Sequence, residues 1–210
     1  MTPVLTYAII GVTVVVSLLA FQNRELQYKW MFNPYTVNQR NEYIRFISSG
    51  FIHNDWGHLL FNMITLYFFG SNVEFILQGM MPGVTGSLLY IGLYLAGIVI
   101  SSIPTYVKHR HNPGYNSLGA SGGVSSVLFA SIMLMPTAKL ALILLPIPIP
   151  GWIFGIIYMI YSYYAGRRGG DNINHDAHLW GAIFGVVFII ILEPAVLPAF
   201  IEEIRSTPIF

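Results

Sequence analysis

Six long apolar segments recur along this chain, and they constrain its fold more than any other feature. They cover residues 3–21, 57–77, 84–104, 118–135, 140–164 and 177–198. Each is close to the ~20 residues that a helix needs to cross the ~30 Å hydrocarbon core of a bilayer. Only 9% of the 210 residues are charged, and mean hydropathy is +0.63. The sequence therefore predicts an all-α, polytopic membrane protein, with six transmembrane helices in one domain over residues 1–210.

Two of these segments have special features. The first lacks a basic stretch before it and is long for a signal peptide, so we predict a retained helix. The fifth contains Pro146, Pro148 and Pro150. Proline removes a backbone donor and obstructs the preceding helical turn, so we expect residues 140–164 to be kinked or partly unwound there.

Composition excludes several classes of function. The chain has no cysteine, so disulfides and thiolate metal sites are ruled out. Its net charge of +1 offers no basic face for phosphates, so no nucleic-acid partner is expected.

Polar residues inside the apolar segments gather at one depth. The second, fourth and sixth helices of a six-helix bundle run in the same direction, so their first turns lie on the same side. His58 and Asn62 occupy that position in the second segment, Ser121 in the fourth and His178 in the sixth. Ionisable residues within membrane segments are costly and usually face a functional interior, so these three helices predict one site.

These residue types fit acyl transfer. A serine hydroxyl needs a base, and histidine is the usual one near neutral pH. His58 and Asn62 share a helix face and can donate hydrogen bonds to an oxyanion, as can the backbone N–H of Ser121 in the first turn of its helix. The small residues around Ser121, Gly119 and Gly122 among them, leave room for a peptide.

Four stretches resemble one known family. "GASG" (Gly119–Gly122) is similar to the GxSG nucleophile motif of the rhomboid intramembrane serine proteases. "HNDWGHLLFN" (His53–Asn62) resembles their second-helix signature, and "AHLWGAIFG" (Ala177–Gly185) resembles the motif with the catalytic histidine. "NEYIRFISSGFIH" (Asn41–His53) resembles the approach from their first loop. The motifs occur in the family's order, and the implied domain core covers about residues 40–198.

The resemblance implies a peptide-bond hydrolase without cofactor or metal that cleaves transmembrane segments of proteins in the lipid bilayer. Ser121 would be the nucleophile and His178 the general base, with no aspartate. His58, Asn62 and the Ser121 N–H would stabilise the oxyanion. Gly181 and Gly185 form a small-xxx-small pair, which favours close approach of the sixth helix to the fourth.

Ser125 departs from the family pattern. Many members have an aromatic residue at this position, four after the nucleophile, where it packs against the catalytic imidazole. We expect either a less tightly oriented base or a replacement by another ring. The polar loops 105–117 and 165–176 are expected to cap the site, with Gly166, Gly169 and Gly170 as hinges.

Loop charge conflicts with the orientation that the resemblance implies. The cations on the presumed active-site side are Arg24, Lys29, Arg40, Arg45, Lys108, Arg110, Arg167 and Arg168, against only Lys139 and Arg205 opposite. The positive-inside rule would turn the richer side toward the cytoplasm. In bacterial members this side faces outward, and the expectation here follows the family, in a bacterial cell membrane.

Other interpretations stay open at this point. A zinc site could draw on His53, His58, His175, Asp176 and His178, although His53 and His58 are five apart and no HExxH pattern is present. A histidine-lined transporter would also place polar residues at depth. It predicts carboxylates within the spans, whereas the acidic residues here fall almost wholly in loops or at the ends of the spans. Small-residue packing or interhelical hydrogen bonds would equally account for any one of these polar residues alone.

Overall fold

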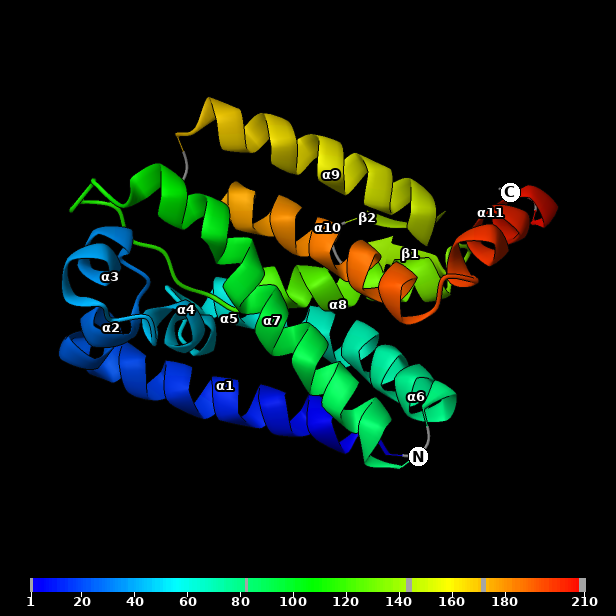
Figure 1. The fold of residues 1–210 in the computed structure, drawn as a ribbon, viewed down its shortest axis with the longest axis horizontal. Coiled ribbons are helices and arrows are strands. Elements are labelled where there is room, and N and C mark those ends of the chain that lie inside the picture. Colours follow the sequence, from blue (N-terminus) through cyan, green and yellow to red (C-terminus); the bar gives the residue numbers. More distant parts are fainter. Residues whose placement is uncertain (1, 82, 143–144, 171–172, 208–210) are drawn as a thin grey trace.

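The computed structural model describes residues 2–81, 83–142, 145–170 and 173–207 as a helical bundle with one short β hairpin (Figure 1). The helices are α1 (Val4–Gln22), α2 (Arg24–Trp30), α3 (Pro34–Arg40), α4 (Arg45–Ser48), α5 (Trp56–Thr65), α6 (Ser71–Met80), α7 (Val84–His109), α8 (Ser121–Leu134), α9 (Gly151–Arg168), α10 (His175–Leu192) and α11 (Val196–Ser206). A 3₁₀ turn, η1 (Ser49–Phe51), follows α4, and a π-helical turn, η2 (Leu66–Gly70), joins α5 to α6.

The predicted all-α membrane bundle is confirmed. Among the described residues, four helices are long and apolar enough to cross a membrane: α1, the continuous helix over 56–80, α7 and α10. α8 is apolar but has only 14 residues. Because 14 residues rise only ~21 Å, α8 is shorter than the ~30 Å hydrocarbon core.

The fifth predicted segment, 140–164, is wrong at its start. Strands β1 (Lys139–Leu142) and β2 (Leu145–Pro150) form an antiparallel hairpin, and α9 begins only at Gly151. Because proline has no backbone N–H, prolines at every second position leave one side of β2 without backbone hydrogen-bond donors. An edge strand tolerates this, whereas a helix interior does not.

Other boundaries also differ from the prediction. The sixth segment, 177–198, divides into α10 and α11, with Pro194 between them. The first loop, residues 23–55 between the first two long helices, contains three short helices and η1. Gly166 lies inside α9 and is no loop hinge, whereas Gly169 and Gly170 have φ of +61° and +101°. Of the predicted loop 165–176, residues 171 and 172 lie outside the described residues.

α8 forms the centre of the bundle, and its residues from Gly122 to Met133 are all buried. It meets α10 and α7 almost backbone to backbone. A Cβ at Gly181 would overlap the Gly122 carbonyl, and one at Gly185 would overlap the Ser126 carbonyl. On the α7 side, a Cβ at Gly123 would lie 2.8 Å from the Tyr94 carbonyl oxygen. Glycine is therefore required where these three helices cross.

This crossing fixes the depth at which α8 begins. Gly122, in its first turn, lies directly against Ser101 of α7. Ser101 is eight residues before the end of α7 at His109. At 1.5 Å per residue, α8 therefore begins ~12 Å inside the bundle, measured along α7.

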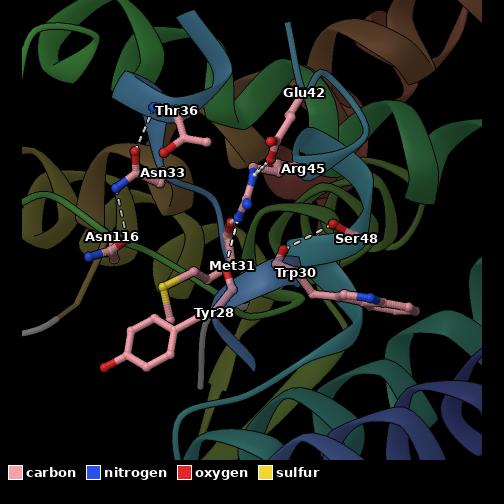
Figure 2. A network of polar contacts seen from close by, with 9 residues as sticks. All are labelled: Tyr28, Trp30, Met31, Asn33, Thr36, Glu42, Arg45, Ser48 and Asn116. Atoms are coloured by element: carbon pink, nitrogen blue, oxygen red, sulfur yellow. Dashed lines mark hydrogen bonds and ion pairs between the residues drawn. The ribbon is translucent and has the colours of Figure 1, made fainter. Parts of the chain in front are cut away.

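The first loop is a folded unit centred on Arg45 (Figure 2). The buried Arg45 guanidinium donates to Glu42 Oε2 at 2.6 Å and to the carbonyls of Tyr28 and Met31 at 2.8 Å. The adjoining Phe32 pairs with Ser117 through two backbone hydrogen bonds of 2.8 and 3.0 Å. The loop is thereby joined to the segment that leads into α8.

At the other end of the bundle, Glu74 of α6 holds the start of α1. Its fully buried carboxylate accepts hydrogen bonds from the backbone N–H groups of Leu5 and Thr6 and from the Thr6 hydroxyl, at 2.7–3.0 Å. The first N–H groups of a helix lack intrahelical partners, and a carboxylate there satisfies them.

Candidate active site

Ser121 is the first residue of α8, and a tight turn leads into it. Gly119 has φ of +122°, a conformation that suits glycine, and its N–H donates to the Ser49 carbonyl at 2.9 Å. The Ala120 N–H donates to His53 Nε2 at 3.3 Å. Ser121 itself is partly buried, and its backbone N–H belongs to the first helical turn, where donors lack intrahelical partners.

His58 lies directly against this turn. A Cβ at Gly119 would lie 2.7 Å from His58 Nε2, so the imidazole fills the space that a side chain would need. Asp55 caps α5 by accepting from the His58 N–H at 2.8 Å. Asn62, one turn further, is buried and donates from Nδ2 to the His58 carbonyl at 2.9 Å. The amide has a second N–H for another acceptor.

His178 belongs to the first turn of α10, which two polar contacts fasten to α7. Asn174 caps α10 by accepting from the Ala177 N–H at 3.1 Å, and it also accepts from Thr105 Oγ1 at 3.2 Å. Lys108 and Asp176 form an ion pair of 3.0 Å. His178 precedes Gly181, which contacts Gly122, by one turn. The structure thus brings the first turns of α8 and α10 together.

Tyr158 of α9 is a residue of this site that the sequence did not indicate. Its ring lies nearly parallel to the His178 imidazole, with centres 6.1 Å apart and planes 15° apart. Its hydroxyl lies 2.6 Å from Ser125 Oγ. The ring expected from the family pattern at position 125 is therefore supplied by another helix, and Ser125 anchors it.

His53 is fully buried and joins the first loop to α1 and α8. Its Nδ1 lies 2.9 Å from Ser17 Oγ on α1, while Nε2 accepts from the Ala120 N–H. Burial, followed by the charge of the nearby His58, lowers the pKa of His53 to about 3. A neutral ring is needed for this arrangement, because a protonated imidazole has no acceptor nitrogen.

A small polar cavity adjoins Ser121. Its volume is about 20 Å³, and its walls include the residues Ser101, Ser102, Ser117 and Asn174. This is enough space for one water molecule, and the hydroxyl and amide groups supply hydrogen-bonding partners.

The histidines considered for zinc form two separate pairs. The His53 and His58 rings are 5.0 Å apart, and the His175 and His178 rings are 5.8 Å apart. Among the residues that the structure describes, no three His, Asp or Glu side chains gather as a metal-ion site requires.

Comparison with known proteins identifies the family. The rhomboid domain matches residues 40–195. RHOMBOID-like protein 12, mitochondrial, of Arabidopsis thaliana is 32% identical over 148 residues, which cover 67% of this chain and 44% of the relative. Presenilin-associated rhomboid-like protein A, mitochondrial, of Danio rerio is 34% identical over 148 residues, 68% of this chain and 36% of the relative.

Rhomboid protein 1, mitochondrial, of Saccharomyces cerevisiae is 28% identical over 188 residues, 88% of this chain and 52% of the relative. The chain therefore spans about half or less of the length of these curated relatives. The family match covers most of the chain, including α8, α10 and the helix that carries His58. This chain belongs to the rhomboid family.

Proposed function

We propose that this protein is an intramembrane serine endopeptidase that cleaves transmembrane segments of protein substrates, with Ser121 as nucleophile and His178 as general base. The observation that carries the proposal is the glycine contact between Gly122, the residue after Ser121 in α8, and Gly181, which lies one turn after His178 in α10. A serine and a histidine on these adjoining turns supply the nucleophile and base that peptide hydrolysis needs.

The reaction proceeds in two acyl-transfer steps. His178 takes the proton from Ser121 Oγ as this oxygen bonds to the scissile carbonyl carbon. The tetrahedral intermediate then breaks its C–N bond, and His178 returns the proton to the leaving amine. A water molecule, deprotonated by His178, attacks the acyl-enzyme, releases the new carboxyl end and restores the Ser121 hydroxyl.

The developing oxyanion is stabilised by three donors: the Ser121 N–H, the His58 imidazole and the Asn62 amide. Support for His58 comes from its contact with Gly119, two residues before the nucleophile. Support for Asn62 comes from its burial on the same helix face. The polar cavity beside Ser121 is suited to hold the hydrolytic water.

The proposal is for a multi-pass protein of a cellular membrane whose substrates span the same bilayer. The relatives named above are mitochondrial proteins, so the bacterial cell membrane expected from the sequence has no support from them.

The test is cleavage of a model transmembrane substrate by the purified protein in proteoliposomes. Ser121→Ala and His178→Ala should both abolish cleavage while the melting temperature stays near wild type, because neither change adds bulk to the bundle. Cleavage by folded Ser121→Ala at the wild-type rate would overturn the proposal.

Asn62→Ala separates an oxyanion donor from the dyad in the same assay. We expect cleavage to fall about 100- to 1,000-fold but to stay measurable, because two other donors remain. His58→Ala should lie between Asn62→Ala and Ser121→Ala. An Asn62→Ala variant with wild-type activity would remove Asn62 from the oxyanion site.

A further inference from the structure

Tyr158 connects three helices at the base of the proposed dyad. The residue itself is on α9, its ring faces the imidazole of His178 on α10, and its hydroxyl contacts Ser125 on α8. Ser125 is almost fully buried, which shields the 2.6 Å hydrogen bond from water. A short hydrogen bond between two hydroxyls fixes the phenol, whose ring plane lies within 15° of the imidazole plane.

We infer that Tyr158 is a positioning residue for His178, held in place through Ser125, and that the placement of α9 thereby sets the orientation of the base. The inference rests on the proposed function, since it assigns a role to the ring beside the proposed base. Tyr158 acts through His178 and takes no proton from the substrate.

The packing of α9 explains why this placement matters. In Figure 1, α9 and α1 form opposite edges of the bundle. Only Gly151, Gly155 and Ser162 of α9 are buried. A Cβ at Gly155 would lie 3.4 Å from Phe129, an ordinary contact distance, so α9 meets α8 through side chains rather than backbone. The Tyr158 ring can therefore hold His178 only while α9 keeps its position against α8.

The experiment measures the rate at which a fluorophosphonate phosphonylates the protein in detergent, as the serine oxygen bonds to phosphorus and fluoride leaves. This rate reports on nucleophile activation without requiring that a transmembrane substrate bind. Tyr158→Leu removes the ring, and we expect labelling to slow about 10- to 100-fold, since misplacement of a catalytic group is costly. Tyr158→Phe keeps the ring but loses the hydrogen bond, and we expect a slowing of about five-fold.

A double-mutant comparison isolates the hydrogen bond from general packing. Ser125→Ala should slow labelling as much as Tyr158→Phe, and the double variant should be no slower than either, because both remove the same bond. Met159→Ala is the matched control. It removes another side chain of α9 that packs on the same cluster without removing the Tyr158 ring, and it should label at the wild-type rate even if its melting temperature falls.

The outcomes separate this inference from the proposed function. Wild-type labelling by folded Tyr158→Leu, or equal slowing by Met159→Ala, would overturn the positioning role and leave Ser121 as nucleophile. If Tyr158→Leu fails to fold, additive effects of Tyr158→Phe and Ser125→Ala would overturn it instead. Labelling that persists in Ser121→Ala would refute the proposed function itself.

Discussion

α8 has two contrasting sides. Toward α10 and α7 its backbone lies so close at Gly122, Gly123 and Ser126 that each contact requires a glycine on one of the two helices. Toward α9 it presents side chains, with Phe129 5.4 Å from the Tyr158 ring and Ser125 bonded to the Tyr158 hydroxyl. The first side holds the helices of Ser121 and His178, the proposed nucleophile and base, at one separation, whereas the second permits adjustment. The proposed dyad would then have a rigid frame, while the orientation of its base would depend on α9.

One glycine substitution on each side of α8 tests the difference between the two sides, and it has the largest expected effect. Gly181→Ala should destabilise the bundle and lower cleavage about 100-fold or more, because its Cβ would overlap the Gly122 carbonyl and separate the dyad helices. Gly155→Ala should retain activity and melt at or above the wild-type temperature, because its Cβ finds ordinary contacts and alanine favours a helix. Cleavage rate and thermal melting in detergent check both variants. Equal cleavage rates and melting temperatures in the two variants would show that the two sides of α8 do not differ in this way.

Moving the aromatic ring from position 158 on α9 to position 125 on α8 tests the side of α8 that faces α9. Ser125→Tyr alone should lose up to about 3 kcal/mol of stability, because Tyr158 already fills the space beside Ser125. Adding Tyr158→Ala should restore melting temperature and part of the activity, since the new ring then occupies the vacated volume. A fully stable and active Ser125→Tyr single variant would show that the space is larger than the contacts indicate.

The smallest effect concerns the turn before α8, where His53 accepts from the Ala120 N–H. The folded-state pKa of His53 is about 3, below its ordinary value of 6.5, so the unfolded chain binds this proton first as pH falls. The stability that the neutral His53 ring contributes is thus fully present above pH 6.5 and declines as the pH falls toward 3. His58 and Asp55 are the titratable groups that influence this ring.

Thermal melting at pH 7 and pH 5 measures this decline. We expect the wild type to lose about 1–2 kcal/mol more than His53→Gln over this range, because glutamine keeps an acceptor but does not titrate. The other histidines are present in both proteins, so their contributions cancel. An identical pH dependence in the two proteins would contradict a buried neutral His53.

Much of this architecture could be predicted from the sequence, and the omissions have physical causes. The apolar segment 118–135 predicted that Ser121 lies in the first turn of a helix, and α8 begins at this residue. The start of α9 could not be predicted, because the leucines and isoleucines of 140–150 have the hydropathy of a membrane helix, whereas the prolines between them have the backbone limits of an edge strand. Tyr158 was missed because a nearly all-apolar helix gives no periodic signal of which face meets a neighbour. Its role depends on a contact between segments distant in sequence.

Identification of the labelled residue tests most directly whether Ser121 is a nucleophile activated by His178. The folded protein is treated with a fluorophosphonate in detergent, digested and examined by mass spectrometry. We expect one adduct on Ser121, absent from Ser121→Ala and strongly reduced in folded His178→Ala. An adduct on another residue, or undiminished labelling of Ser121 in His178→Ala, would contradict this role of the two residues.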